Sequence, residues 1–442
     1  YEELGWGGFW AWDPVENAAL MPWLTGTAFL HSVMIQEKRN MLKIWNVVLI
    51  ILTFGLTIVG TFLTRSGIIN SVHAFTKSEI GPAFLIFLAF ILVIGFSLLF
   101  KRINMLESEH KIDSILCREN VFLAQNVLLV GIAFTVLLGT TFPLLAEAVR
   151  GTKLSIQAPF FNTIIAPMGY LLLLLMGIGT LIAWRKSSWE GLLRNFRNPL
   201  ILATAGTVFL AWFLSDRDLL WSVHTIFWLA IFVTSTIVLE IANAVQVKSN
   251  QTKSNIIMGL FYVITNNPRR YGGLLIHFGV VLMFLGFAGA FFKVERNMTL
   301  ESGVSQQIGE YSLKFKQVEE FIVGNATHRA AIVEVFDKQG NLLEVMKPAK
   351  SFYPTQPQPL TEVAIRRSFL EDLYLIFSSE NGGEQDSVTL RVFINPLVGW
   401  AWMALPVFTL GVGLSMSYRP KSLVANETIL RERYLAAQAA NS

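Results

Sequence analysis

The feature that most constrains this chain is a series of apolar runs, each long enough to cross a lipid bilayer. A transmembrane helix needs about 20 predominantly apolar residues. Hydrophobic residues make up 53% of the 442-residue chain and charged residues 15%, whereas soluble domains carry roughly 25% charged residues. The sequence therefore predicts an α-helical polytopic membrane protein with about nine transmembrane helices. The expected spans are 14–36, 44–64, 80–100, 121–146, 160–184, 198–215, 220–245, 271–293 and 396–417.

Basic residues between these spans indicate their orientation. Nineteen lysines and arginines lie in the connecting segments 37–43, 101–120, 185–197, 246–270 and 418–433. The short loops on the other side hold only Arg65, Lys77, Arg150, Lys153 and Arg217. Because loops rich in lysine and arginine stay on the cytoplasmic side, the second set is predicted to face outward. The apolar stretch 255–266 is too short to span and is expected to lie along the inner surface.

Residues 294–395 have a different character. Apolar and polar residues alternate at 311–316, and turn residues at 338–341 and 381–383 separate further candidate strands, as in β-hairpins. We expect a β-rich domain on the outer face, since long domains cross the membrane largely regardless of their charge. The net charge of +4 gives no indication of a nucleic-acid partner. Cys117 is the only cysteine, so neither an intrachain disulfide nor a Cys-x-x-Cys-His haem attachment motif is possible.

Three tryptophans and a phenylalanine fall within seven residues near the start of the chain. They are Trp6, Phe9, Trp10 and Trp12, broken by Gly7 and Gly8 and followed by Asp13. Asp13 and Glu16 have the spacing of a capping box that begins a helix. An interfacial belt would account for tryptophans alone. Four aromatic side chains around a Gly-Gly bend favour a platform for a large flat ligand, because glycine lets the backbone approach that ligand closely.

Two histidines are expected at the same depth in different helices. His31 lies five residues before the inner end of the first span, and His277 lies six residues after the inner end of the eighth. At 1.5 Å per residue, both are roughly 8–9 Å from the inner boundary. They could bind one haem iron from opposite faces, or they could be unrelated residues that are each hydrogen-bonded in the bundle. Ionisable residues in transmembrane helices are rare and usually functional.

The remaining candidates are less specific. His73 lies on the predicted outer loop after the second span, on the side of the tryptophans. Arg65 could pair with a carboxylate such as a haem propionate, or it could anchor the helix at the membrane boundary. His110 and His224 are interpreted as incidental, and His328 is expected on the surface of the β domain.

These motifs resemble the tryptophan-rich (WWD) signature of the haem-handling cytochrome c biogenesis proteins, and among them the CcmF family. Phe9 stands where that family usually has tryptophan. Tyr1 is not a start methionine, so we expect that the family's N-terminal part, with a second outer histidine, is lacking. The resemblance covers essentially the whole chain, and further matching segments follow in the family's order: 60–67, 71–75, 269–273 leading to His277, 361–365 and 372–374.

The resemblance implies a division of the chain and a set of ligands. Residues 1–16 would form a periplasmic haem platform and 14–293 a region of eight transmembrane helices. A periplasmic β domain (294–395), a final helix (396–417) and a cytoplasmic tail (418–442) would follow, in a bacterial inner membrane. His31 and His277 would hold a transmembrane haem b. Substrate haem would rest on the platform formed by Trp6, Gly7, Gly8, Phe9, Trp10, Trp12 and Asp13, with His73 as its axial ligand.

The implied activity is that of a cytochrome c haem lyase subunit. A CcmE-like haem chaperone would deliver haem, and the thiols of an apocytochrome c Cys-x-x-Cys-His motif would add across its vinyl groups. CcmH- and CcmI-like subunits would bind the apocytochrome, and the buried haem could reduce the delivered haem. Three alternatives stay open: a haem exporter that only loads the chaperone, a quinol-oxidising electron-transfer subunit, and a relative dedicated to nitrite reductase maturation.

Overall fold

The computed structural model describes residues 1, 7–66, 80–108, 110, 112–151, 154, 156–214, 221–354, 358–380 and 387–418. Within these ranges, nine helices are long and apolar enough to cross a membrane, which confirms the predicted polytopic helical class. A short apolar helix, α8 (Ile256–Asn266), lies between the seventh and eighth of them. The nine are α1 (Pro14–Arg39), α2 (Lys43–Arg65), α3 (Gly81–Lys101), α4 (Arg118–Arg150), α5 (Ala158–Leu181), α6 (Trp189–Phe213), α7 (Trp221–Thr252), α9 (Pro268–Ala288) and α10 (Val398–Met416).

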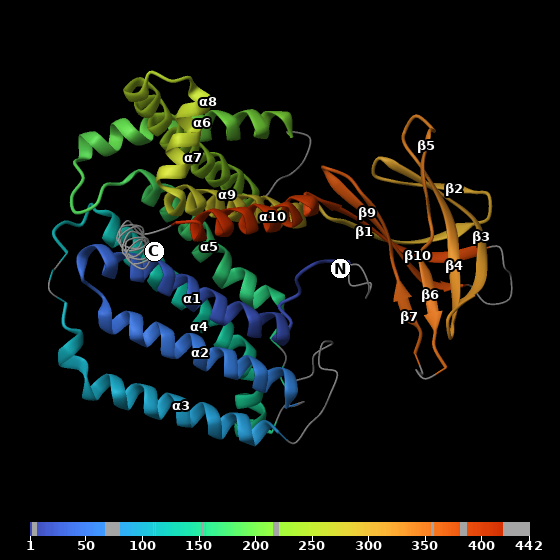
Figure 1. Ribbon diagram of the computed structural model, residues 1–442. Coiled ribbons are helices and arrows are strands. Elements are labelled where there is room, and N and C mark those ends of the chain that lie inside the picture. The colour runs from blue at the N-terminus through green and yellow to red at the C-terminus, as the bar shows by residue number, and fades with distance from the viewer. Residues whose placement is uncertain are drawn as a thin grey trace, which may run out of the picture.

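The long helices run back and forth through one bundle, and the strands form a separate body beyond one end of it (Figure 1). We call the end at which α1 begins the motif end, because the tryptophan-rich residues precede α1 there. The β body lies beyond the motif end, and the N-terminus lies between the two parts (Figure 1). Chain segments far apart in the sequence therefore meet at this junction.

Helix α6 begins earlier than the sequence predicted. The expected span started at residue 198, after a stretch that contains Arg194 and Arg197. The helix in fact begins at Trp189, since the Ser188 side chain accepts a hydrogen bond from the Gly191 backbone N–H and caps the first turn. Arg194 and Arg197 therefore belong to the helix. The expected start rested on hydropathy, which does not detect an N-cap residue such as Ser188.

Helices α9 and α10 pack closely through small residues. Gly272, Gly279 and Gly286 recur every seven residues along α9, and a Cβ added at each would collide with α10. Gly411 of α10 shows the reciprocal crowding against α9. Small residues let transmembrane helices approach closely enough for dispersion contacts along the backbone. This contact ties α10, the helix that follows the strands, to the helix that carries His277.

The β body is a sandwich of two antiparallel sheets. The first sheet has the order β1 (Val294–Glu301), β10 (Ser387–Pro396), β9 (Glu371–Glu380) and β8 (Ala364–Arg367). The second has β2 (Ser305–Ile308), β3 (Tyr311–Val323), β4 (Ala326–Phe336), β6 (Ala349–Phe352) and β7 (Leu360–Glu362), with β5 (Leu342–Met346) also on β4. Their facing side chains, such as Leu313, Val333 and Val392, form one buried core.

Both predicted hairpins are present. Strands β4 and β5 pair around a turn closed by the Asp337 N–H, which donates to the Asn341 carbonyl at 3.0 Å. Strands β9 and β10 also pair, and residues 381–386 between them lie outside the described ranges. The prediction of a β-rich domain is therefore confirmed.

The expectation that His328 lies on the surface of the β domain is wrong. This residue of β4 is 8% exposed. Its Nδ1 lies 2.7 Å from the oxygen of the Ser351 hydroxyl, whose proton is donated to Glu362, and the Phe321 ring is parallel to its imidazole at 5.3 Å. The neighbouring strand β6 and the Phe321 side chain cover His328, which the local sequence did not reveal.

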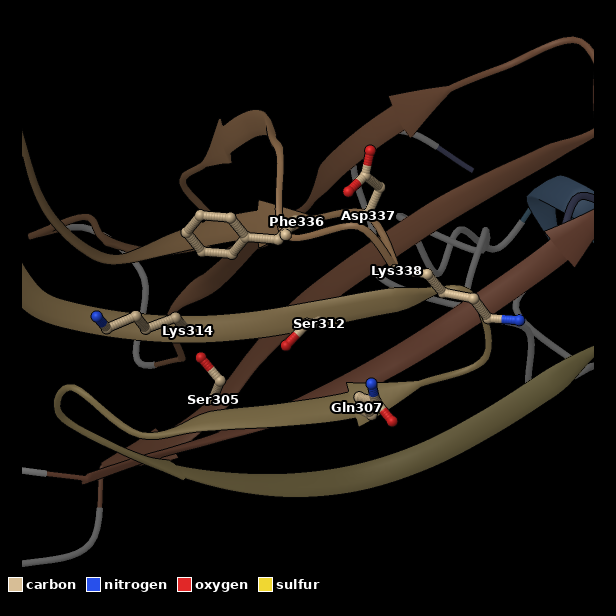
Figure 2. Close-up of a pocket in the computed structure, with 8 residues that line it drawn as sticks. Ser305, Gln307, Ser312, Lys314, Phe336, Asp337 and Lys338 are labelled. Atoms are coloured by element: carbon tan, nitrogen blue, oxygen red, sulfur yellow. The ribbon is translucent and has the colours of Figure 1, made fainter.

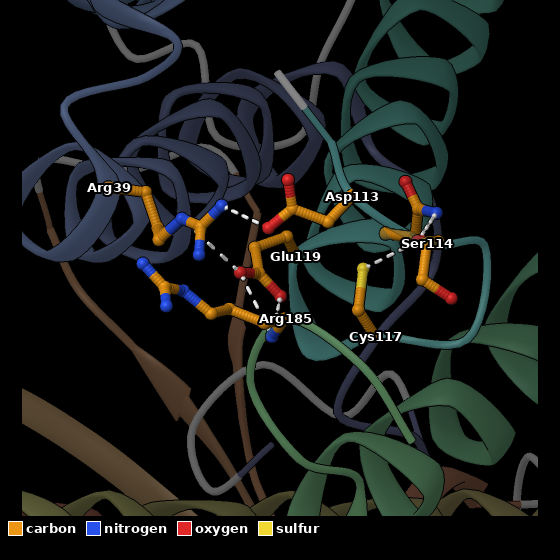
Figure 3. A network of polar contacts seen from close by, with 7 residues as sticks. Arg39, Asp113, Ser114, Cys117, Glu119 and Arg185 are labelled. Carbon is orange, nitrogen blue, oxygen red and sulfur yellow. Dashed lines mark hydrogen bonds and ion pairs between the residues drawn. The ribbon is translucent and has the colours of Figure 1, made fainter. Parts of the chain in front are cut away.

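At the bundle end opposite the motif, a polar network around the buried Arg39 and Glu119 joins α1 to α4 (Figure 3). The guanidinium of Arg39 donates to Asp113 at 2.7 Å and lies 3.7 Å from Glu119. Glu119 also accepts hydrogen bonds from the backbone N–H of Arg185. The Arg39 hydrogen bond holds the pKa of Asp113 below its usual value. The network fixes the ends of the two helices whose side chains surround His31.

Candidate functional site

The first turn of α1 is built as the sequence predicted. The Asp13 carboxylate accepts a hydrogen bond from the Val15 N–H at 2.9 Å, and Glu16 accepts one from the Asp13 N–H at 3.1 Å. Glu16 also accepts from the Ala11 N–H at 2.9 Å. This capping box satisfies backbone donors that a helix start leaves unpaired. It also fixes the path by which the tryptophan-rich residues enter the bundle.

Gly7 occupies a position that no larger residue could take. Its φ is +70°, and a Cβ there would overlap the ring of Phe393 on β10. Positive φ is accessible to glycine without steric cost. A Cβ on Gly8 would meet nothing within 4 Å. Gly7 is thus the residue that seats the tryptophan-rich segment on the β sandwich, whereas Gly8 leaves open space beside it.

The three described aromatic residues of the segment rest on different elements. Phe9 stacks on Phe287 of α9, with centroids 5.9 Å apart and an interplanar angle of 15°. Trp12 stacks on Phe161 of α5 at 4.9 Å and 13°. Trp10 meets Trp12 edge-on at 5.5 Å and is 40% exposed. Trp10 is therefore the ring that presents most surface, and among these contacts it rests on Trp12, while Phe9 rests on α9.

Trp12 has an unusual backbone conformation. Its φ is +58°, a value that costs a non-glycine residue about 1–3 kcal/mol and is concentrated at functional sites. Three contacts hold it there: the Phe161 stack, a 2.8 Å hydrogen bond from its indole N–H to Asn162, and a 3.1 Å bond from Asn17 to its carbonyl. The surrounding helices therefore impose the Trp12 conformation.

His31 of α1 and His277 of α9 lie side by side inside the bundle. Their rings are parallel to within 5° and their centroids are 6.1 Å apart. An imidazole binds a metal through the in-plane lone pair of a ring nitrogen, at about 2 Å, so two neighbouring imidazoles can share one metal when a nitrogen of each points toward it. The structure therefore brings together the two histidines that the sequence predicted at one depth.

Hydrogen bonding at the pair also fits ligation. His31 Nδ1 lies 2.9 Å from the Thr27 carbonyl one turn earlier, so it carries the proton and leaves Nε2 with a free lone pair. Histidines that bind metals usually donate their other N–H in this way. His277 Nδ1 is buried and has no hydrogen-bond partner among the described residues. Among the described residues, no three or more histidine, cysteine or acidic side chains are grouped so that they could bind a metal ion by themselves.

A chain of aromatic contacts leads from His31 toward the end of the bundle opposite the motif. Phe122 of α4 meets His31 edge-on at 5.5 Å and meets Trp184 edge-on at 5.7 Å. The Lys38 ammonium lies 4.4 Å and the Arg118 guanidinium carbon 5.5 Å from the Trp184 ring centroid. Phe122, Trp184 and Thr27 carry no signal in the sequence that would select them, because only the three-dimensional packing relates them to His31.

The other predicted residues are placed as follows. Trp6 and His73 lie outside the described ranges. Arg65 is the last residue of α2, exposed at the motif end. His224 lies in the first turns of α7 beside a shallow hollow that Thr207, Thr225 and Trp228 line, and His110 is exposed.

The second sheet of the sandwich carries a polar hollow far from both histidines. Its volume is about 350 Å³, and residues of β2 and β3 and of the β4–β5 turn line it, including Ser305, Lys314 and Asp337 (Figure 2). Lys338, on its rim, pairs with Glu310 at 2.6 Å. The residues that line this hollow include neither a histidine nor a pair of stacked aromatic rings. We therefore place the candidate site at the motif end and within the bundle.

Fold and site together define a polytopic helical membrane protein with a tryptophan-rich junction between its bundle and a β sandwich. Residues 291–396 match the family model for the CcmF C-terminal beta-sandwich, and residues 1–69 match the model for cytochrome C assembly proteins. The cytochrome c-type biogenesis protein CcmF of Pseudomonas fluorescens is 36% identical over 406 residues, covering 91% of this chain. The chain belongs to the CcmF family.

Two further relatives agree with this assignment. The cytochrome c-type biogenesis protein CcmF of Escherichia coli is 35% identical over 431 residues, or 95% of this chain and 62% of the relative. A solved structure described as the cytochrome c haem lyase CcmF superposes with a TM-score of 0.75 at 32% identity, over 95% of this chain and 62% of that one. The P. fluorescens relative is covered over 59% of its length, so the chain spans about three fifths of the relatives it matches.

Proposed function

We propose that this chain takes part in attaching haem to c-type cytochromes and that it handles haem at two sites. One is the tryptophan-rich junction at the motif end, and the other is the His31–His277 pair inside the bundle. The observation that carries the proposal is that these two imidazoles, from helices far apart in the sequence, lie next to each other inside the bundle with parallel rings. Family membership supports it, since relatives are named for cytochrome c-type biogenesis and haem lyase.

The buried pair would hold a haem b, with His31 and His277 as the two axial ligands. Haem bound there would supply one-electron chemistry to the protein. The Thr27 carbonyl keeps the proton on His31 Nδ1 and orients the ring. Phe122 lies against the His31 edge and limits access of water from the α4 side. Quinol in the membrane is a reductant of the right chemical class for such a site.

The junction would bind the haem that is to be attached. Trp10 presents its ring, Trp12 supports it edge-on, Phe9 rests on α9, and Gly8 leaves room for a flat ligand beside the backbone. Aromatic faces stack on a porphyrin plane as they do on one another. His73 would supply an axial ligand, and Arg65 at the same end would pair with a propionate.

The proposed partners follow from this arrangement. A CcmE-like chaperone would bring haem to the junction, and CcmH- and CcmI-like subunits would present the apocytochrome there. The thiols of its Cys-x-x-Cys-His motif would add across the haem vinyl groups while the junction holds the porphyrin. The excess of basic residues in the connections at the other end of the bundle supports an inner-membrane orientation with the junction and sandwich in the periplasm.

Absorption spectra of the purified protein, oxidised and dithionite-reduced, test the buried site. Wild type should give a low-spin b-type spectrum that is lost or becomes high-spin in both His31→Ala and His277→Ala. His224→Ala is the matched control, because His224 also lies in a long apolar helix but away from the pair. An unchanged spectrum in both histidine variants, after reconstitution with haem, would rule out the buried site.

A further inference from the structure

The first sheet of the sandwich is buried on both faces at the junction. Residues 372–377 of β9 and 392–395 of β10 are buried in unbroken succession. Alternate residues of a strand point to opposite faces, so unbroken burial requires a cover on each side. The sandwich core covers one face. The other face, which carries Asp372, Tyr374 and Phe393, needs a second cover.

Tyr1 is part of that cover. Its hydroxyl donates to the Asp372 carboxylate at 3.0 Å and accepts from the Asn395 amide at 3.3 Å. Its carbonyl accepts from the Tyr374 hydroxyl at 2.8 Å. Its ring lies 5.1 Å from the Tyr374 ring and 6.1 Å from Trp402 of α10. One residue therefore contacts β9, β10 and a helix of the bundle.

Gly7 is the other described point of attachment, since its backbone sits on the Phe393 ring. Phe393 and Tyr374 are cross-strand partners whose rings meet edge-on at 5.7 Å. Tyr1 and Gly7 are thus held by adjacent residues of one sheet. Phe9, Trp10 and Trp12 follow directly after this attachment, so its position determines where the aromatic rings can lie.

We propose that Tyr374, Asp372 and Phe393 of the sandwich are positioning residues for the tryptophan-rich junction, acting through Tyr1 and Gly7. The sandwich thereby holds Trp10 in place for haem. This inference rests on the proposed haem site at the junction. Beyond that site, the inference assigns the first sheet a role in haem affinity. Tyr374, Asp372 and Phe393 would affect this affinity without being haem ligands.

The test measures binding of haemin to the purified full chain by quenching of tryptophan emission, in wild type, Tyr1→Ala and Tyr1→Phe. Tyr1→Ala removes both the ring contacts and the hydroxyl bonds, and should weaken haemin binding about tenfold. Tyr1→Phe keeps the rings in contact and should bind with intermediate affinity. Tyr311→Phe is the matched control, since it removes a hydroxyl from the same sandwich without touching the N-terminal segment.

The spectrum of the buried haem provides an internal check, because it should be the same in all four proteins. Wild-type haemin affinity in Tyr1→Ala would overturn the positioning role while leaving the proposed haem site intact. A loss of affinity in Tyr311→Phe equal to that in Tyr1→Ala would also overturn it, since general loosening of the sandwich would then explain both. If wild type itself binds no haemin at the junction, the proposed function of that site fails, and this inference fails with it.

Discussion

The rings of His31 on α1 and His277 on α9 are parallel to within 5°, with their centroids 6.1 Å apart. These residues are 246 positions apart in the chain. His31 is held by its own helix through the Thr27 carbonyl. The position of His277 depends on α9, which the glycine contacts with α10 hold in turn. A ligand bound between the rings would join these two independently supported helices.

If the pair ligates a haem, His31→Met should raise the midpoint potential of that haem. A His/Met ligand set favours the reduced state more than two histidines do. The rise should be on the order of 100 mV, within the roughly 0.8 V range over which axial ligands tune haem. Potentiometric titration of the b-type absorption band measures it. His224→Met should leave the potential unchanged, and an unchanged potential in His31→Met would contradict ligation by His31.

The hydrogen bond between Trp12 and Asn162 should matter for haem binding at the junction. Asn162→Leu removes the acceptor of the Trp12 indole N–H while keeping a side chain of similar size, so the strained Trp12 backbone loses one of its restraints. One neutral hydrogen bond contributes about 1 kcal/mol, and we expect about fivefold weaker haemin binding by fluorescence titration.

A matched control is available on α6. Thr204→Val removes the acceptor of another indole N–H, that of Trp228, at 3.2 Å. This pair lies away from the junction, so haemin affinity should not change. Equal losses in Asn162→Leu and Thr204→Val would indicate that the effect does not arise at Trp12.

Glu119 should be important for stability. It is almost fully buried, pairs with Arg39 and accepts hydrogen bonds from the Arg185 N–H. Removing one partner of a buried ion pair leaves the other without compensation, so Glu119→Ala should lower the free energy of unfolding by about 3 kcal/mol. Glu190 occupies the same first-turn position in α6 but is exposed, and Glu190→Ala should cost about 0.5 kcal/mol. Denaturant unfolding in detergent compares the two, and similar losses would show that the network is not specifically stabilising.

Local chemistry made some of these features predictable. The start of α1 follows from Asp13 and Glu16, whose capping box involves residues only a few positions apart. The equal depth of His31 and His277 follows from counting residues along two helices. The start of α6 was missed because one hydroxyl, that of Ser188, extends the helix through a basic stretch that looked like a connection.

Contacts between distant segments could not be predicted in this way. Burial of His328 depends on β6 and on the Phe321 ring, and strand alternation does not say which face of β4 is covered. The bond from Trp12 to Asn162 spans 150 positions, and the bond from Tyr1 to Asp372 spans 371. Each is set by how helices and sheets pack, and the types of the two residues alone do not indicate it.

The Asp372 contact predicts a pH dependence of the junction between bundle and sandwich. Burial raises the pKa of Asp372 above its usual value, against the lowering effects of the Tyr1 hydrogen bond and the nearby Arg367 charge. Burial also raises the pKa of the other two groups in this contact, Tyr1 and Tyr374, which stay neutral in the acidic and neutral range.

In the folded protein Asp372 therefore binds its proton more tightly than in the unfolded chain, where an aspartate has a pKa of about 3.9. Its contribution to stability is fully present below that value and is lost as pH rises through the higher pKa of the folded state. Asp372→Asn keeps an acceptor for the Tyr1 hydroxyl but cannot ionise, so it should lack this part of the pH dependence and gain stability relative to wild type at pH 7.5.

Thermal unfolding of both proteins at pH 4.5 and 7.5 measures the difference. The stability change between the two pH values should be smaller in Asp372→Asn, while Asp337→Asn, at an exposed turn of the same sandwich, should not gain stability at pH 7.5. The pKa of Asp337 is lowered by the Asn341 side chain, so its contribution has the opposite sign and is lost as pH falls. Identical pH dependence in wild type and Asp372→Asn would contradict this prediction. It would mean that ionisation of Asp372 does not change the stability of the contact with Tyr1.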